Sequence, residues 1–403
     1  MNVTHPLRIA VVSETYPPEI NGVARTIGTM VRELHRRNHS IQLIRPRQHA
    51  GDHGDADAGI NTILVRSIPL PRYGQLRIGL PARRMLLRAW KTRRPDIVQV
   101  VTEGPLGQSA VNAARQLGIP IISEFHTDFR SYSEHYGLGL LSRLVAAHLR
   151  RLHNCADCTL APTAQMKDQL AARGYRHLQV VGRGIDTSCF GVSHRCAALR
   201  RSWGASDDDL IALYVGRIAA EKNLRLFVEA AHAMRSVTPQ LRVVVVGDGP
   251  ELAALRASEP TFLYVGRRSG EDLARHYASA DAMIFPSLTE TFGNVTTEAL
   301  ASGLAVVAFD YAAARQYIGH RRNGLLAPFG QANTFVELTQ DLAADPVLRQ
   351  RLRAAAPHAV HTLTWAQVVD DLEAIFRQTI AQAATRPARH ATIVKTRSDH
   401  APL

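Results

Sequence analysis

The chain has 403 residues, of which 46% are hydrophobic and 21% charged. This is the composition of a globular protein, and the length is too great for a single hydrophobic core, so we expect two domains. The formal net charge of +13 predicts an electropositive surface that attracts phosphates, nucleic acids or anionic lipid headgroups.

No stretch approaches the roughly 20 consecutive apolar residues of a membrane-spanning helix. Residues 1–6 lead directly into a strand, without the charged and apolar regions of a secretory signal, so we expect a cytoplasmic protein. Cys155 and Cys158 have no second pair at a similar spacing, because Cys189 and Cys196 lie further apart in a loop. A buried free thiol at Cys158 is a simpler interpretation than a metal or redox site.

In the first half of the chain, apolar runs typical of strands alternate with helical patterns. These runs occupy residues 7–12, 41–44, 62–65, 97–101, 119–125, 159–161 and 178–181. A second series occupies residues 210–215, 241–246, 262–265, 283–285, 304–308 and 325–327. This alternation predicts an α/β fold with two doubly wound parallel sheets.

The boundary between the two domains is predicted at residue 190. Residues 191–209 are rich in Ser, Arg and Asp and lack a strand pattern, which indicates a linker with a short helix. We therefore predict domains over residues 1–190 and 191–364. Apolar residues then recur at helical spacing over 365–384, and residues 385–403 have the composition of a disordered tail.

The loop at residues 49–59 contains an Asp-x-Asp sequence and two histidines, which could suggest a site for a divalent metal. It lacks the glutamate that closes a calcium-binding loop, and it does not open a helix. A solvated connection between two strands is the favoured interpretation.

Ligands of open α/β sheets bind beyond the carboxyl ends of the strands, so the residues after each strand are candidates for a site. After the first strand, Gly22 opens a helix and would let a phosphate or sugar approach the backbone, although a plain helix cap would explain it equally well. His126 follows the strand at residues 119–125, where an imidazole could bond a sugar hydroxyl. An isolated histidine, however, more often has a structural role.

In the second half, Arg217 and Lys222 flank the loop after the strand at residues 210–215. Two cations there could neutralise a diphosphate leaving group, or they could be solvated surface charges. The turn at residues 247–251 lacks Gly-x-Gly-x-x-Gly, which argues against an NAD(P) site. Backbone groups around Val265 could contact a nucleotide base or simply end a strand.

The run at residues 286–303 is the most informative in the chain. It combines a strand end, a glycine turn and a helix start near Asn294, whose first N–H groups favour phosphate. Glu290 and Glu298 lie on either side and would repel that anion, so they are better suited to neutral hydroxyls of a sugar and a ribose. Ordinary exposed acids at a helix start are the alternative.

Seven motifs together resemble the retaining glycosyltransferases of family 4, which have the GT-B fold. They lie at residues 21–23, 124–126, 184–186, 216–223, 247–249, 265–266 and 290–298. The likeness covers nearly the whole chain and is most specific in the second domain. It implies two Rossmann-like domains facing across a cleft, the first on the acceptor side and the second binding a nucleotide sugar. It also implies that no metal or other cofactor is needed.

The resemblance also implies roles for individual residues. The catalytic residues would be His126, Arg217, Lys222 and Glu290. The donor would be bound by Gly22, Val265, Phe292, Gly293, Asn294, Val295 and Glu298. The acceptor is expected to contact Tyr16, Asn21 and Tyr132. In the donor, the two cations would hold the diphosphate, Glu298 the ribose, and Glu290 the transferred sugar.

The motif at residues 14–23 looks most like that of bacterial family members that use GDP-mannose to build mannolipids. We expect transfer of a hexose, mannose from GDP-mannose, to a lipid or glycan hydroxyl with release of the nucleoside diphosphate. A UDP-hexose-dependent glycolipid glycosyltransferase and a GT-B-fold nucleotide-sugar epimerase are the alternatives. A nucleic-acid partner is disfavoured, because neither a helix-turn-helix nor an aromatic stacking platform is visible. Arg183 replaces an asparagine usual in the family, so that residue's role cannot be carried over.

Cationic and apolar side chains interleave between residues 77 and 94. The cations are Arg77, Arg83, Arg84, Arg88, Lys91, Arg93 and Arg94. A basic amphipathic helix here could lie peripherally on the anionic inner face of the cell membrane and present a lipid acceptor. A helix that packs on the sheet with a solvated cationic side is the other interpretation.

Overall fold

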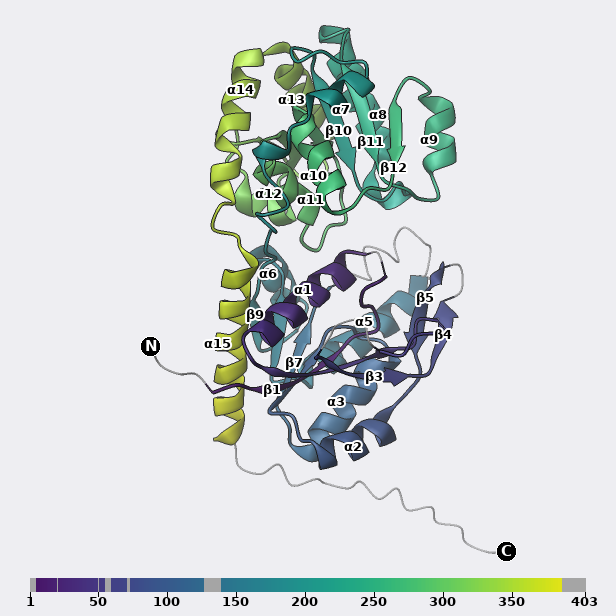
Figure 1. Ribbon diagram of the computed structural model, residues 1–403, viewed down its shortest axis with the longest axis vertical. Coiled ribbons are helices and arrows are strands. Elements are labelled where there is room, and N and C mark those ends of the chain that lie inside the picture. The colour runs from purple at the N-terminus through teal and green to yellow at the C-terminus, as the bar shows by residue number, and fades with distance from the viewer. Residues whose placement is uncertain are drawn as a thin grey trace, which may run out of the picture.

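The computed structural model describes residues 5–19, 21–49, 51–54, 59–70, 73–126 and 139–385. It contains two parallel sheets, one in each half of the chain, with helices on both faces of each sheet (Figure 1). The predicted α/β fold with two doubly wound domains is therefore confirmed. Within the described residues, no helix is both long and apolar enough to cross a bilayer.

The first sheet has seven strands in the order β3-β2-β1-β6-β7-β8-β9. Its strands are β1 (Arg8–Val12), β2 (Ser40–Pro46), β3 (Asn61–Val65), β6 (Ile97–Val100), β7 (Ile121–Glu124), β8 (Cys158–Ala161) and β9 (Leu178–Val180). The helices are α1 (Gly22–Arg36), α2 (Arg83–Thr92), α3 (Pro105–Leu117), α5 (Gly139–Asn154) and α6 (Ala164–Ala172). Each of the seven runs predicted in this half contains or overlaps one of these strands.

The second sheet has six strands in the order β12-β11-β10-β13-β14-β15. Its strands are β10 (Ile211–Val215), β11 (Arg242–Val246), β12 (Leu263–Gly266), β13 (Ala282–Phe285), β14 (Ala305–Phe309) and β15 (Leu325–Ala327). The surrounding helices are α7 (Ala197–Ser202), α8 (Leu224–Val237), α9 (Leu252–Ser258), α10 (Gly270–Ser279), α11 (Asn294–Ala301), α12 (Ala312–Tyr317), α13 (Ala332–Ala344) and α14 (Pro346–Ala355).

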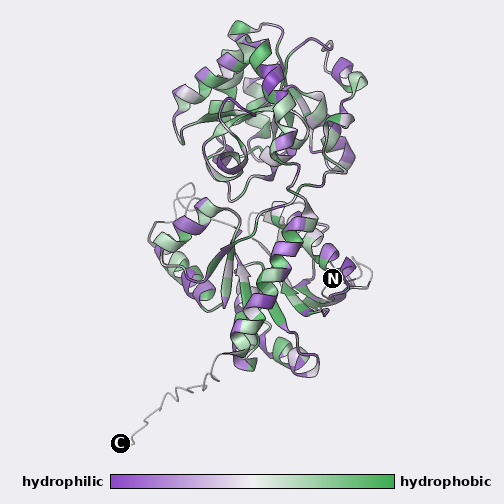
Figure 2. Ribbon diagram, turned by 90° about the vertical axis from the view of Figure 1, so that its left-hand side faces the viewer, coloured by the Kyte–Doolittle hydropathy of each residue, from purple (hydrophilic) through white to green (hydrophobic). Residues whose placement is uncertain are grey.

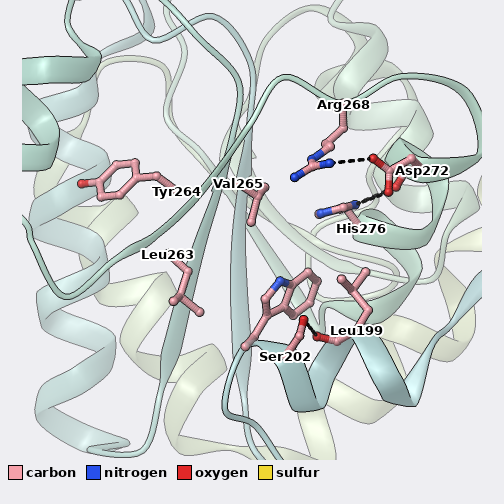
Figure 3. Close-up of a pocket in the computed structure, with 9 residues that line it drawn as sticks. Leu199, Ser202, Leu263, Tyr264, Val265, Arg268, Asp272 and His276 are labelled. Carbon is pink, nitrogen blue, oxygen red and sulfur yellow. Dashed lines mark hydrogen bonds and ion pairs between the residues drawn. The ribbon is translucent and has the colours of Figure 1, made fainter.

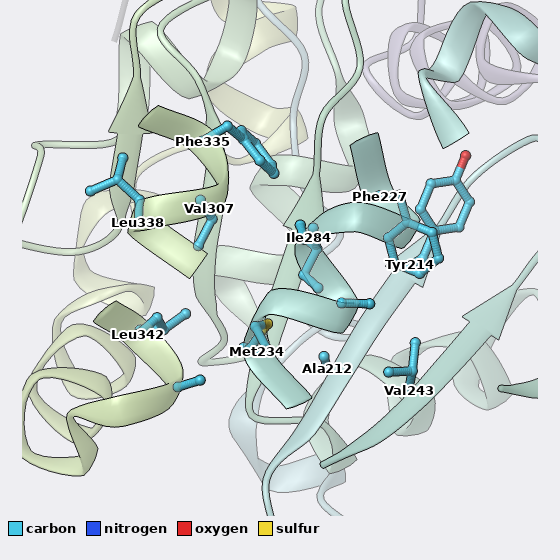
Figure 4. Packing of buried hydrophobic residues seen from close by; sticks show 14 of the residues in the cluster. Ala212, Tyr214, Phe227, Met234, Val243, Ile284, Val307, Phe335, Leu338 and Leu342 are labelled. Atoms are coloured by element: carbon cyan, nitrogen blue, oxygen red, sulfur yellow. The ribbon is translucent and has the colours of Figure 1, made fainter. Parts of the chain in front are cut away.

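The inner strands of both sheets are buried on both faces, which explains their continuous apolar sequences. In β1, Ile9 and Val11 pack into one core, whereas Ala10 and Val12 pack into the core on the opposite face. The second sheet is arranged in the same way, and Figure 4 shows one of its cores, in which strand residues such as Ile284 meet residues of α8 and α13. Hydrophobic strands therefore lie inside each domain, whereas the outer helices carry both hydrophilic and hydrophobic residues (Figure 2).

The last helix of the described residues, α15 (Trp365–Ala384), begins beyond the second domain and lies alongside the first (Figure 1). Val369, Leu372 and Phe376 are buried in the same core as the strand β1. At the helix surface, Arg37 donates hydrogen bonds to Asp370 at 2.5 Å and to the main-chain oxygen of residue 366 at 2.8 Å. Helix α15 thus forms part of the packing of the first domain.

The sequence did not predict the antiparallel hairpin β4 (Ser67–Leu70) and β5 (Tyr73–Gly79). It includes Arg77, whose Nε donates to Ser67 Oγ at 2.7 Å, so Arg77 is not part of a basic helix. The helix α2 starts only at Arg83, and its Leu86 and Trp90 are buried in the domain core. Helix α2 therefore packs on the sheet through its apolar side, and its cationic side is exposed.

Candidate active site

The donor-side candidates follow two neighbouring strands of the second sheet. Arg217 and Lys222 come after β10, and Glu290 comes after β13, which is hydrogen-bonded to β10. At this position the strand order reverses direction, since β10 leads to β11 on one side while β13 begins the other side. A reversal of this kind leaves a crevice at the carboxyl ends of the strands, where open α/β sheets bind ligands.

A glycine turn connects the end of β13 to the helix α11. Gly293 has φ of 95°, a left-handed conformation that a residue with a Cβ rarely adopts, and the helix begins at the next residue, Asn294. The helix start is therefore at the predicted position. Because the first N–H groups of α11 have no partner within the helix, they and the helix dipole favour an anion at this end.

The carboxylate of Glu290 is held on this turn by several contacts. It forms an ion pair with Lys222, accepts a hydrogen bond from Ser287 Oγ at 2.7 Å, and is only 16% exposed. Burial alone would raise the pKa of Glu290, but the Lys222 ammonium and the Ser287 hydroxyl outweigh it and lower the pKa. The hydroxyl of Tyr311 also donates to the main-chain oxygen of Glu290. Glu290 is thus a charged, fixed acceptor at neutral pH.

Arg217 is the more accessible of the two predicted cations. Its side chain is 38% exposed, and Nη1 lies 3.4 Å from Oε1 of the buried Glu221. The loop that carries these cations is bonded to the Glu290 turn, because Thr289 Oγ1 donates to the main-chain oxygen of Glu221 at 3.2 Å and Asn223 Nδ2 donates to that of Pro286 at 3.3 Å. The structure therefore brings Arg217, Lys222 and Glu290 onto two loops that are bonded to each other.

Glu298 is buried in α11. The alternative interpretation, in which Glu298 is an ordinary exposed acid at a helix start, is therefore wrong. Its Oε2 accepts a hydrogen bond from the Tyr277 hydroxyl at 3.0 Å, and its Oε1 is paired with Arg25. Arg25 comes from α1 in the first domain, and its guanidinium carbon lies 5.7 Å from the centroid of the Phe190 ring. The sequence reading missed Arg25, although it lies one helical turn after Gly22. This ion pair joins the two domains directly beside the candidate donor site.

His126 follows β7 in the first domain and is buried. Its Nδ1 lies 3.2 Å from Nη2 of Arg183, and its Nε2 lies 2.9 Å from Oε2 of Glu124. Burial would raise the pKa of Glu124, but the His126 imidazole and the Arg183 guanidinium outweigh burial and lower it. The residues at 127–138, including Tyr132, lie outside the described part of the chain.

Two of the predicted acceptor residues make structural contacts within the first domain. Tyr16 is fully buried in the core of the first domain, so its ring is not accessible to an acceptor. Asn21 caps α1, because its Oδ1 accepts from the Ala24 N–H at 2.8 Å and its Nδ2 donates to Thr15 Oγ1 at 2.7 Å. Gly22 differs from both: a Cβ there would meet nothing within 4 Å, so its backbone is approachable from outside.

Val265 lines a pocket of about 330 Å³ at the edge strand β12. Figure 3 shows Val265 on one side of this pocket and Asp272 on the other, between Arg268 and His276. Asp272 lies 3.1 Å from Nη1 of Arg268 and 3.5 Å from Nδ1 of His276. Glu290 and Phe292 line a different and much narrower cavity. The structure therefore does not place Val265 in one pocket with the other donor candidates.

Where the structure describes them, the residues of the loop at 49–59 and the cysteines make ordinary structural contacts. Asp52 accepts hydrogen bonds from Nη1 of Arg45 at 2.6 Å and from Nη2 at 2.9 Å, and these bonds lower the pKa of Asp52. Cys158 is a buried free thiol, and burial raises its pKa to about 12. Among the residues with described positions, no cluster of three His, Cys, Asp or Glu side chains could hold a metal ion.

Comparison with known proteins gives consistent matches over nearly the whole chain. Residues 20–188 match the model of Glycosyltransferase Family 4, and residues 197–359 match that of Glycosyl transferases group 1. A GDP-mannose-dependent alpha-mannosyltransferase of Mycobacterium tuberculosis is 34% identical over 94% of this chain and 99% of its own length. An alpha-monoglucosyldiacylglycerol synthase of Streptococcus pneumoniae is 25% identical over 85% of this chain and 80% of its own. A sucrose-phosphate synthase from Thermosynechococcus elongatus has a similar fold, with a TM-score of 0.75, 19% identity and coverage of 93% of this chain and 100% of its own.

Proposed function

Because the chain belongs to the family 4 glycosyltransferases of the GT-B fold, we propose that it transfers mannose from GDP-mannose to a hydroxyl of a lipid acceptor, with retention of configuration. The mannose donor is supported by the 34% identity to the M. tuberculosis mannosyltransferase. The lipid acceptor is supported by the S. pneumoniae relative, whose name describes glucosylation of diacylglycerol.

One observation carries the proposal at the level of residues: the carboxylate of Glu290 and the cations Arg217 and Lys222 lie on bonded loops at the strand-order reversal of the second sheet. A diphosphate bound at the start of α11 would face both cations. Glu290 would then accept a hydrogen bond from a sugar hydroxyl, and Glu298 would accept one from the ribose.

In the proposed reaction, the acceptor oxygen forms a bond to the anomeric carbon on the face from which the diphosphate departs. The bond between that carbon and the phosphate oxygen breaks, and the leaving phosphate takes the proton of the acceptor hydroxyl. Arg217 and Lys222 stabilise the negative charge that develops on the departing diphosphate. The residues of this chain contribute mainly by positioning and by charge.

The experiment combines binding and turnover. Thermal shift with GDP-mannose, UDP-glucose, UDP-galactose and UDP-N-acetylglucosamine should show stabilisation by GDP-mannose above the others, because a ligand that binds only the folded state raises Tm. Radiolabelled mannose should then appear in the lipid fraction when diacylglycerol-type acceptors are added. A larger shift with UDP-glucose would reassign the donor. Release of nucleoside diphosphate without acceptor would contradict transfer.

We further propose that the protein works in the cytoplasm and meets its acceptor at an anionic membrane surface. The cations Arg83, Arg84, Arg88 and Lys91 are exposed on α2, whereas its Leu86 and Trp90 are buried in the domain. Attraction would therefore be electrostatic, without insertion of the apolar side of α2. Flotation with phosphatidylglycerol-containing liposomes should recover the protein at low salt and lose it at high salt. No binding to anionic vesicles at any salt concentration would exclude this surface.

A further inference from the structure

Arg25 on α1 links the first domain to Glu298 of the second. Its guanidinium forms an ion pair with Oε1 of Glu298. The side chain of Glu298 is only 4% exposed, whereas that of Arg25 is 53% exposed. A second contact between the domains joins Gln165 Oε1, on α6, to the N–H of Ala312 at 3.0 Å. Glu298 is therefore fixed within its own domain, while the guanidinium of Arg25 can exchange this contact for water.

Residues of the second domain form the position that the guanidinium occupies. Phe190 and Tyr277 are both buried in the core of that domain, and their rings meet edge to face with centroids 5.8 Å apart. The Tyr277 hydroxyl donates to Oε2 of Glu298 at 3.0 Å. The guanidinium carbon of Arg25 lies 5.7 Å from the centroid of the Phe190 ring. Because both rings pack within the core, the site at Glu298 does not depend on α1 for its shape.

The chemistry of this carboxylate lets two different groups take the same place. An ionised carboxylate only accepts hydrogen bonds, so the partner of Oε1 must be a donor. A guanidinium N–H and a ribose hydroxyl both meet this requirement. Oε2 already accepts from Tyr277, so either group is directed to Oε1, the oxygen that Arg25 contacts. A ribose that bonds to Oε1 must therefore move the guanidinium aside.

We propose that Arg25 and the ribose of the nucleotide compete for Glu298. With the guanidinium on Glu298, the pair acts as a latch that holds α1, and with it the first domain, against the second. When the ribose hydroxyls replace the guanidinium, the latch opens and Arg25 turns into solvent. That the competing group is a ribose rests on the proposed function. The latch itself does not, because it consists of Arg25 and Glu298 alone.

Calorimetric titration with GDP tests the competition. A latch that is closed in about four-fifths of the molecules lowers the apparent affinity about 5-fold, so Arg25→Met should bind GDP about 5-fold more tightly than the wild type. Glu298→Gln breaks the same pair but should bind GDP about 10-fold more weakly, because the ribose loses its charged acceptor. Arg36→Met is the control, at an exposed arginine paired with Glu33 on the same helix, and should bind as the wild type does. Equal or weaker binding by Arg25→Met would overturn the proposal, since a merely structural ion pair would shift both variants in one direction.

Small-angle X-ray scattering without nucleotide tests the latch separately. Arg25→Met, Glu298→Gln and the double variant should share one radius of gyration, larger than that of the wild type, because two changes to the same contact do not add. A wild-type radius in Arg25→Met would overturn the latch. If the wild type bound no GDP but the scattering changed as expected, the proposed donor would be wrong and the latch would stand. If Arg25→Met does not fold because Glu298 is left buried without its cation, the double variant removes both charges and permits the same comparison.

Discussion

The two domains share one architecture but differ in how their candidate site residues are brought together. In the second domain, Glu290, the Gly293 turn and Glu298 belong to one short run of sequence, and Arg217 and Lys222 follow the neighbouring strand. In the first domain, His126 and Arg183 are contributed by separate strands and meet only in the folded sheet. A site encoded locally can be recognised from sequence, whereas one assembled across strands requires the structure.

The largest expected effect tests the locally encoded site. Lys222→Ala should lower kcat by about 100-fold, corresponding to ~2.7 kcal/mol of barrier, because it removes one of the two charges proposed to stabilise the leaving diphosphate. Lys167→Ala is the matched control, since Lys167 is a partly exposed lysine on α6 that belongs neither to this site nor to the cationic surface of α2. Steady-state transfer of labelled mannose measures both variants. Equal kcat in the two would remove Lys222 from the mechanism.

Glu298→Gln should have a smaller effect, and it should change the KM for the donor rather than kcat. If Glu298 binds the ribose equally in the ground and transition states, its loss raises the KM for the donor about 10-fold and leaves kcat nearly unchanged. Glu271→Gln, an exposed glutamate on α10 paired with Arg275, serves as the control. A fall in kcat at constant KM would instead place Glu298 in the chemical step.

The contact between Arg37 and the last helix tests stability rather than turnover. Arg37→Ala removes hydrogen bonds to α15 and should lower the free energy of unfolding by about 1 kcal/mol, a change of roughly 2–4 °C in Tm. Arg36→Ala is the control, because the exposed Arg36 pairs only with Glu33 on its own helix in the described structure. Calorimetry that gave equal Tm values for both variants would show that the contact contributes nothing.

The last prediction concerns the pH dependence of stability and Glu14, in the first domain. Burial raises its pKa to about 7, although the carboxylate also accepts from the Leu106 N–H at 2.9 Å at the start of α3. The fold favours the neutral form of Glu14. The stability that this group contributes is therefore fully present below the ordinary pKa of 4.5 and is lost as the pH rises through 7. Glu14→Gln lacks this pH dependence, so the Tm of the variant should rise relative to that of the wild type between pH 5 and pH 8. Parallel Tm profiles would show that Glu14 does not titrate in this interval.

Much of the fold could be predicted from sequence because buried parallel strands have continuous apolar sequences, as in β1 and β10. The hairpin β4–β5 could not, since its short strands carry no such pattern. The start of α11 was predictable from Gly293, whose left-handed backbone requires glycine. The burial of Tyr16 was not, because an aromatic residue after a strand is compatible with either a core or a cleft. Arg25 was missed, and no role could be assigned to Arg183, since the partners of both lie far away in sequence.

The packing of α15 affects how the protein folds during synthesis and whether its first domain can be produced as a separate fragment. The chain leaves the first domain near residue 185 and returns at residue 364, where Ile185 and Thr364 form a β-bridge, so two segments cross between the domains. A fragment that ended at the first crossing would expose the apolar surface normally covered by Phe376. During synthesis, the core of the first domain can therefore close only after α15 has been made, and α15 is synthesised after the whole second domain.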